Sequence, residues 1–188
     1  MNIGFALCGS FCTYAQVFPI MEALAQKHTL IPIFSPVSYT TDTRFGTANA
    51  HIRRATEICG REPLHTIAQV EPIGPKKLLD ALIIAPCTGN TLAKLAHSIA
   101  DTSVTMAAKS HLRNGRPVLI AISTNDALAG AAENIGKLLA RKNYYFVPFR
   151  QDDALGKPTS MIADLTLLPA ALESALEGRQ LQPLLVTS

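Results

Sequence analysis

Residues 83–101 read IIAPCTGNTLAKLAHSIAD. A short apolar run stops at Pro86, small polar residues follow, and apolar residues then recur at helical spacing. This pattern predicts a buried strand that ends in a polar turn and leads into a helix. Open α/β sheets bind their ligands at such junctions, beside the carboxyl ends of the strands. The stretch therefore indicates the fold class and points to a ligand site.

The same alternation of strand and helix continues along the chain. Continuous apolar runs predict parallel strands buried on both faces, and apolar residues three and four apart predict the helices between them. Right-handed crossovers make such units a three-layer, doubly wound parallel α/β sheet of the flavodoxin-like or Rossmann-like class, with expected strand order 2-1-3-4-5. The strands are expected at 2–8, 30–34, 81–85, 117–122 and 144–148.

The connecting segments give four further expectations. The stretch 60–75 holds three prolines and is expected to be mostly loop. A single helix is expected over 127–142, and a polar loop over 150–160. A last helix, over 162–176, is expected to kink or break at Pro169.

Composition narrows the class of protein. With 188 residues, 48% hydrophobic and 16% charged, the chain is expected to form one globular domain over 1–188. The net charge of +3 and the scattered basic residues argue against nucleic-acid binding. No apolar run approaches the ~20 residues of a membrane span. The N-terminus lacks a basic leader region, so we expect a cytoplasmic protein. The four cysteines form no paired CxxC set, so no metal site is expected.

Three polar turns follow strands whose ends should meet at one edge of the sheet. Free N–H groups at a helix start suit a phosphate, and polar side chains around them suit a nucleotide-like ligand. Any one of these turns would equally serve as a plain helix cap, and the sequence leaves this alternative open. The candidate binding residues are Gly9, Ser10 and Phe11 after strand 1, Thr88 and Asn90 after strand 3, and Ser123, Thr124 and Asn125 after strand 4.

No catalytic set stands out, so the catalytic residues stay unassigned. There is no evident acid pair and no Ser-His-Asp order. His28 and His111 are expected to be exposed near helix ends, whereas His51 and His65 fall in a loop-rich region from which they could reach the site.

The stretch from Ala85 to Asp101 resembles the PxSANTxAKxAxGxxD signature of the FMN-binding flavoprotein family. That family includes phosphopantothenoylcysteine decarboxylase, peptidyl-cysteine decarboxylases and flavin prenyltransferases. Gly9-Ser10 falls where the family has a phosphate loop, Ser35 where a serine follows strand 2, and Asn125 where the family has the asparagine of its PAMN motif. The resemblance implies an FMN site that includes these residues.

The chain also departs from the family. The decarboxylases carry a catalytic histidine eight residues before the aspartate that leads into strand 3, and counting back from Asp80 gives Pro72. Ile122 and Thr124 replace the proline and methionine of the PAMN motif. Because proline cannot transfer protons, the resemblance does not extend to cysteine decarboxylation.

Three segments resemble one branch of the family, the B subunits of dipicolinate synthases: GFALCGSFCTY (4–14), STNDALAGAAENIGKLL (123–139) and YYFVPFRQDDALGKPTSMIAD (144–164). The resemblance implies a partner, the A subunit of the synthase, that carries NADP. It also implies a small dicarboxylate substrate and a homo-oligomer. The implied reaction oxidises dihydrodipicolinate to dipicolinate (pyridine-2,6-dicarboxylate) in the mother cell of a sporulating bacterium.

The segment after strand 5 supplies the candidate substrate-binding residues. Arginine and lysine form charge-assisted hydrogen bonds with carboxylates, although Lys157 fits a solvated loop equally well. The substrate-binding candidates are Arg150, Lys157, Thr159 and Ser160.

Two alternative functions stay open: a free-standing FMN-dependent decarboxylase or flavin prenyltransferase, and a non-catalytic binding protein with a vestigial flavin pocket.

Overall fold

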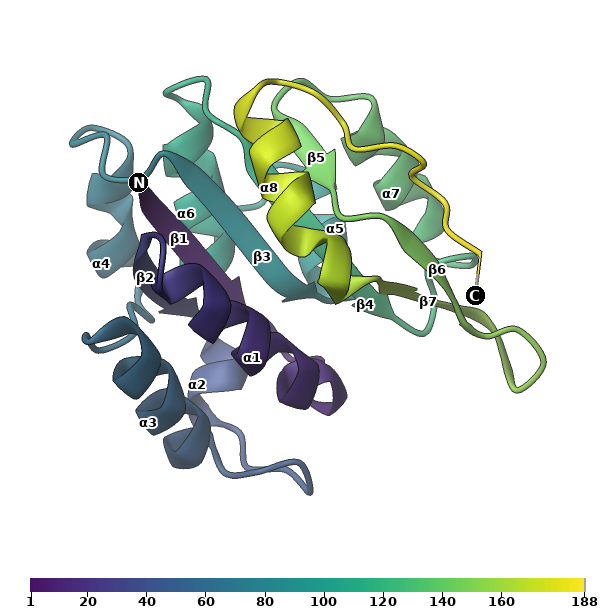
Figure 1. Cartoon of the computed structure of the whole chain (residues 1–188), viewed down its shortest axis with the longest axis horizontal. Coiled ribbons are helices and arrows are strands. Elements are labelled where there is room, and N and C mark those ends of the chain that lie inside the picture. Colours follow the sequence, from purple (N-terminus) through teal and green to yellow (C-terminus); the bar gives the residue numbers. More distant parts are fainter. Residues whose placement is uncertain (188) are drawn as a thin grey trace.

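A computed structural model describes residues 1–187 (Figure 1). One 7-stranded sheet runs through its centre, and its parallel strands lie in the order β2-β1-β3-β4-β5, as predicted. An antiparallel pair, β7 and β6, continues the sheet from the end of β4. The strands are β1 (Asn2–Leu7), β2 (Thr29–Phe34), β3 (Ala81–Cys87), β4 (Val118–Thr124), β5 (Tyr144–Phe146), β6 (Phe149–Asp153) and β7 (Lys157–Ala163).

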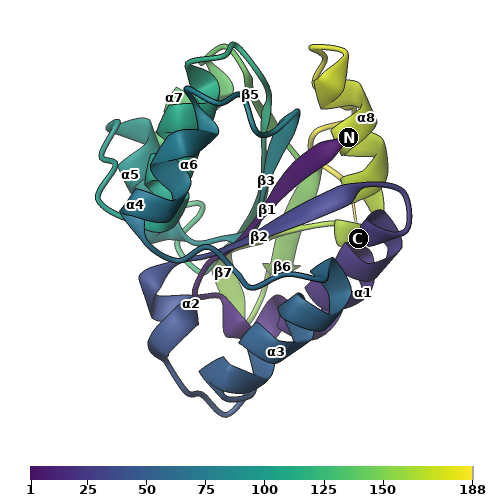
Figure 2. The same ribbon diagram turned by 90° about the vertical axis from the view of Figure 1, so that its left-hand side faces the viewer.

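Helices cover both faces of the sheet, so the predicted three-layer class is confirmed (Figure 2). One face carries α1 (Tyr14–Ala25), α8 (Leu168–Leu176) and, packed against α1, α3 (Ala48–Cys59). The other face carries α4 (Ile67–Val70), α5 (Gly89–Ala96), α6 (Ser103–Leu112) and α7 (Ala132–Leu139). The short helix α2 (Pro36–Thr40) follows β2.

The central strands hold the core. Every residue of β3 is buried, and so is every residue of β1 after Asn2. Burying each large aliphatic side chain contributes about 1.5–3 kcal/mol, which explains why these strands read as unbroken apolar runs. Gly4 in β1 has a packing role, because a Cβ there would lie 2.6 Å from Leu79 Cδ1 and 2.8 Å from Leu82 Cδ1.

Several predicted segments need correction. The stretch 60–75 holds the short helix α4, whose first turn is fixed by a capping box of Thr66 and Gln69, and then a 3₁₀ turn. The helix expected from 127 begins only at Ala132, because the amides of Ala129 and Ala131 both donate to the Asp126 carbonyl in a turn. The last parallel strand ends at Phe146 rather than at 148.

The segment after β5 is the largest correction. The sequence predicts a loop there, but β6 and β7 form an antiparallel hairpin, whose turn is closed by the Gly156 amide donating to Asp153 Oδ1 at 2.8 Å. Its outer residues are exposed on both faces, so they lack the apolar alternation that marks a half-buried strand. The helix expected from 162 begins at Leu168, and Pro169 lies in its first turn, where the missing N–H is not needed.

Within the described part of the chain, no helix combines the length and the apolar composition that crossing a membrane requires.

Candidate functional site

A cavity of about 690 Å³ opens at the carboxyl ends of β1, β3 and β4, with the β6–β7 hairpin as one wall. Its volume is in the range of small-molecule and cofactor pockets. The three polar turns of the sequence meet here, which is the geometry expected for parallel strands in this order. The predicted residues that line the cavity are Gly9, Ser10, Phe11, Thr88, Asn90, Ser123, Thr124, Asn125, Lys157 and Ser160.

The turn after β1 leaves the amides of Phe11 and Cys12 without an acceptor within residues 1–187, whereas those of Ser10 and Thr13 donate to the carbonyls of Cys8 and Ser10. Ser10 and Thr13 occupy N-cap positions of the 3₁₀ turn and of α1, yet neither side chain caps the helix. Ser10 Oγ instead donates to the Ser123 carbonyl at 2.7 Å, and Thr13 Oγ1 donates to the Ser10 carbonyl at 2.7 Å. The first amides of a helix have no intrahelical acceptor, and the helix dipole adds partial positive charge there. This end of the cavity therefore suits an anion.

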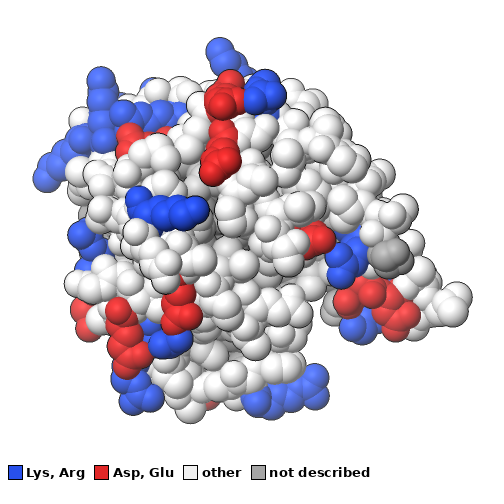
Figure 3. All heavy atoms as spheres, viewed as in Figure 1, with Lys and Arg blue, Asp and Glu red and all other residues white. Residues whose placement is uncertain are grey.

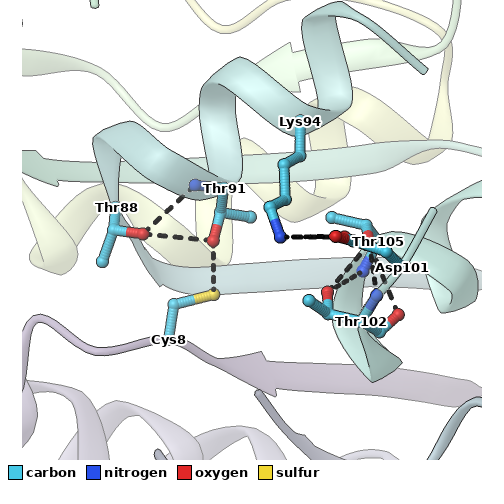
Figure 4. Close-up of polar contacts among 7 residues, drawn as sticks. All are labelled: Cys8, Thr88, Thr91, Lys94, Asp101, Thr102 and Thr105. Atoms are coloured by element: carbon cyan, nitrogen blue, oxygen red, sulfur yellow. Dashed lines mark hydrogen bonds and ion pairs between the residues drawn. The ribbon is translucent and has the colours of Figure 1, made fainter. Parts of the chain in front are cut away.

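The turn after β3 is organised by threonines (Figure 4). Thr88 Oγ1 caps α5 by accepting from the Thr91 amide at 3.3 Å, and Thr91 Oγ1 donates to Cys8 Sγ at 3.4 Å. Thr88, and not Asn90, is thus the N-cap of α5. The Asn90 side chain is exposed at the cavity and has no hydrogen-bond partner among residues 1–187, so it is available to a ligand.

The end of β4 is tied to both neighbouring turns. Thr124 Oγ1 donates to Asp126 Oδ1 at 2.5 Å, and Thr159 Oγ1 donates to the Asn125 carbonyl at 2.6 Å. A Cβ on Gly89 would lie 2.7 Å from Asp126 Oδ1 and 2.8 Å from Thr124 Oγ1. The turns after β3 and β4 therefore touch, and only glycine fits at the contact without a shift.

The basic side chains that were expected to bind substrate, Arg150 and Lys157, are each paired with an acidic side chain. Lys157 Nζ lies 2.8 Å from Asp152 Oδ2, and this bond raises the pKa of Lys157, which keeps its charge at neutral pH. The pair lies on the protruding hairpin, where Figure 3 shows blue and red side chains side by side. Arg150 lies 3.4 Å from Asp164 Oδ2 and does not line the cavity.

Several other candidates also lie outside the cavity lining. Thr159 reaches it only through its bond to the Asn125 carbonyl. Ser35 is buried, caps α2 and shares a hydrogen bond of 2.8 Å with Ser38 Oγ. Pro72, where the decarboxylases have histidine, lies in a 3₁₀ turn and does not line the cavity either.

The histidines do not line the cavity. His51 packs among Phe11, Tyr14 and Phe18, and His65 stacks on Tyr39 with 3.7 Å between ring centroids. His111, expected to be exposed, is instead fully buried, with Nε2 3.0 Å from the Pro117 carbonyl. Burial lowers the pKa of His111 to about 4, so the ring is neutral.

Two of the cysteines beside the site are inert. Cys8 and Cys87 are buried at the ends of β1 and β3. Burial raises the pKa of Cys8 to about 11 and that of Cys87 well above its ordinary value, so both stay protonated thiols. Cys12, in contrast, is exposed and lines the cavity.

Sequence reasoning missed part of the lining. Asp126 directly follows the polar turn after β4, so its position could have been inferred. Thr43 and Phe45 come from the segment between α2 and α3, for which the sequence offered no signal. The lining residues that were not predicted are Cys12, Thr13, Gln16, Thr43, Phe45, Gly89, Asp126, Asp152, Met161 and Ile162.

Similarity to known proteins covers the whole chain. The sequence profile of the family described as Flavoprotein matches residues 1–163. The B subunit of dipicolinate synthase from Bacillus subtilis (strain 168) is 45% identical over 186 residues, which is 98% of this chain and 93% of that protein. The crystal structure of the B subunit of dipicolinate synthase from Bacillus halodurans C is 43% identical, has a TM-score of 0.91, and covers 100% of this chain and 96% of that one.

A more distant structure shares the fold. The crystal structure of an FMN-dependent cysteine decarboxylase is 20% identical, has a TM-score of 0.67, and is aligned over 94% of this chain and 95% of its own. The family signature around β3 and the three converging turns lie within the residues that the family profile matches. The chain belongs to the Flavoprotein family, within the branch formed by the B subunits of dipicolinate synthases.

Proposed function

We propose that this chain acts as the B subunit of a dipicolinate synthase, and that with its A-subunit partner it oxidises dihydrodipicolinate to pyridine-2,6-dicarboxylate. The observation that carries this proposal is the 45% identity to such a protein along 98% of the chain. The cavity supports it, since a pocket of about 690 Å³ with polar turns on three sides can hold a small polar substrate.

FMN fits the residues at the cavity. The uncapped amides after β1 suit its phosphate, and the exposed Asn90 side chain together with the Ser123–Asn125 turn offers donors and acceptors to its ring system. Gly89 keeps the contact between these turns free of a Cβ. When bound, FMN supplies a centre that exchanges a hydride. We propose Gly9, Ser10, Phe11, Thr88, Asn90, Ser123, Thr124 and Asn125 as its binding residues.

Forming the aromatic ring removes one hydride and one proton from the substrate. NADP on the partner is the proposed final hydride acceptor. The chain's own residues must orient the ring, and Ser160 lies in the lining, where its hydroxyl can bond a carboxylate, while Lys157 beside it is paired with Asp152. The proton needs a base, and the carboxylates in the lining are Asp126 and Asp152. Fixing the ring against the acceptor is the main contribution expected from the protein, because aromatisation itself is downhill.

The two other functions have less support. This chain lacks the catalytic histidine of the decarboxylases, because proline occupies position 72. A non-catalytic protein with a vestigial pocket would assemble with the partner without contributing a hydride centre. Measurements of flavin content and of turnover separate these functions from the synthase.

The test is a synthase assay that follows pyridine-2,6-dicarboxylate absorbance with this chain alone, with the A-subunit partner alone, and with both. We expect activity only in the mixture, and a flavin spectrum in the purified chain. Asn90→Ala should reduce flavin content and turnover without preventing assembly with the partner, whereas Asn49→Ala, an exposed change on α3, should alter neither. A mixture without activity would refute the proposed function, and activity without flavin would refute the cofactor assignment.

A further inference from the structure

A dicarboxylate substrate poses an electrostatic problem for this cavity. The charged residues of the lining are Asp126, Asp152 and Lys157, and the lysine is already paired with Asp152 at 2.8 Å. Arg150, the other cation expected to bind substrate, is paired with Asp164. Two negative charges brought into such a lining need a cation that has no acidic partner of its own.

The segment between α2 and α3 carries such a cation, Arg44, between two residues that line the cavity, although Arg44 itself is not part of the lining. Thr43 and Phe45 line the cavity, and the Phe45 side chain is 46% exposed. The guanidinium carbon of Arg44 lies 4.8 Å from the centroid of the Phe45 ring. Arg44 is exposed and forms no ion pair or hydrogen bond through its side chain within residues 1–187.

The turn that carries Arg44 is held in place. The amides of Thr43 and Gly46 each donate to the other's carbonyl, at 3.0 and 3.1 Å, and Asp42 Oδ1 accepts from the Ala48 amide at 2.8 Å. Gly46 has φ of +134°, and a Cβ there would lie 2.7 Å from His51 Cε1. The turn therefore rests on the buried His51 ring, which packs against α1.

The contact with Phe45 leaves the N–H donors of the Arg44 guanidinium without a hydrogen-bond acceptor within residues 1–187. The attraction to an aromatic ring acts through the flat face of the group, while its N–H donors point outward in the plane. A guanidinium placed this way offers a bidentate pair of donors to a carboxylate.

We propose that Arg44, stacked on Phe45, binds one carboxylate of the dianionic substrate and so selects dicarboxylates over monocarboxylates. The inference rests on the proposed function for its substrate class. It assigns the cation that recognises the second carboxylate to the turn between α2 and α3. The basic residues of the hairpin, in contrast, are already paired with carboxylates of the chain.

The experiment compares two ligands on wild-type chain and on variants. Pyridine-2,6-dicarboxylate and pyridine-2-carboxylate differ by one carboxylate, and isothermal titration calorimetry measures the affinity of each. Arg44→Gln should weaken dicarboxylate binding by about 10- to 100-fold, as expected for a charged hydrogen-bonded contact, and monocarboxylate binding by less than about 3-fold. Arg44→Lys should fall between Arg44→Gln and wild type, since it keeps the charge but loses the fork.

Two further variants act as controls. Arg53→Gln removes the same charge from a side chain on α3 that is 77% exposed, and it should change neither affinity. Phe45→Leu removes the aromatic platform and should weaken dicarboxylate binding by about 2- to 5-fold. Thermal melts of all variants should match wild type, because the altered side chains are exposed.

The outcomes separate this inference from the proposed function. If Arg44→Gln binds the dicarboxylate with wild-type affinity, or loses affinity for both ligands to the same extent, the role of Arg44 is refuted while the synthase proposal stands. If wild-type chain alone binds neither ligand, the same variants are compared by kcat/KM in the mixture with the partner, where an unchanged value for Arg44→Gln refutes its role. If the wild-type chain binds neither ligand and the mixture with the partner is also inactive, both proposals are refuted.

Discussion

Replacing Gly89 with alanine tests the contact between the turns after β3 and β4. The family signature carries alanine at this position and methionine at that of Thr124. In this chain, Thr124 Oγ1 and Asp126 Oδ1 lie 2.8 and 2.7 Å from where the Cβ would be. Both oxygen atoms would have to retreat by roughly 0.6–0.7 Å to reach ordinary van der Waals contact.

The expected cost follows from opposing effects. Replacing glycine by alanine at a compatible backbone position stabilises a protein by about 0.4–1 kcal/mol. Crowding of this kind costs about 1–3 kcal/mol, and separating Thr124 from Asp126 costs about 1 kcal/mol within that range. Crowding therefore wins, and Gly89→Ala should lower the free energy of unfolding by about 1 kcal/mol and Tm by about 2–4 °C.

Denaturant unfolding and thermal melts measure this change, and fluorescence titration with FMN measures its effect on the site. The matched control is Gly136→Ala in α7, where a Cβ would meet nothing within 4 Å, and this variant should gain about 0.4–1 kcal/mol. Adding Asp126→Ala to Gly89→Ala should recover about 1 kcal/mol, since one of the two crowding side chains is gone and Thr124 Oγ1 is no longer held by Asp126. If Gly89→Ala is as stabilising as Gly136→Ala, the reasoning about this contact is wrong.

Three further predictions concern the site and its surroundings. Ser10→Ala removes the bond to the Ser123 carbonyl and should cost about 1 kcal/mol of stability in denaturant unfolding, together with weaker FMN binding in fluorescence titration. Burial holds the pKa of His111 at about 4, against 6.5 ordinarily, so between these pH values the unfolded chain binds a proton that the folded chain does not. The free energy of unfolding should therefore fall by about 2 kcal/mol from pH 6.5 to pH 4.5, and His111→Phe should remove most of this dependence in denaturant unfolding. Iodoacetamide should modify the exposed Cys12 faster than the buried Cys8, and bound FMN should protect Cys12, as mass spectrometry of the labelled peptides would show.

Each of these has a control and a contrary outcome. Ser98→Ala, an exposed change after α5, should leave both stability and FMN binding as in wild type. The exposed His97, changed to glutamine, should leave the acid sensitivity intact, and the same sensitivity in His111→Phe would contradict the role of burial. Cys12→Ser should abolish the fast labelling phase, whereas equal labelling rates with and without FMN would place FMN away from this cavity.

The parallel sheet was predictable because its central strands, β1, β3 and β4, are buried on both faces. Burial on both sides leaves a continuous apolar run of strand length bounded by turn residues, as in β3 from Ala81 to Cys87. The hairpin after β5 was not predictable in the same way. The residues from Arg150 to Pro158 are exposed or half-buried, so their pairing leaves no periodic trace in the sequence.

The residues of the candidate site also fall into a predictable group and a group that could not be predicted. Residues directly after a central strand were placed at the cavity by topology alone, and the structure brings Gly9, Asn90 and Asn125 together there. Residues whose position depends on tertiary contacts were not found. Phe45 lies at the cavity on a turn that rests on a buried histidine, and Lys157 is paired with Asp152 at 2.8 Å within the hairpin.

Strand β4 has two different neighbours along one edge. Its first residues, Val118 to Ile120, pair with β5 in parallel, while Ser123 and Thr124 pair with β7 in the antiparallel sense. The floor of the cavity is thus built into the central parallel sheet, whereas the hairpin wall pairs with β4 at two residues, packs Phe149 and Met161 into the core at its base, and is exposed over residues 151–158 at its tip. Changes in the length or charge of this exposed tip, which carries Asp152 and Lys157 of the lining, therefore alter the cavity wall without disturbing the buried sheet, so that substrate preference can evolve separately from stability.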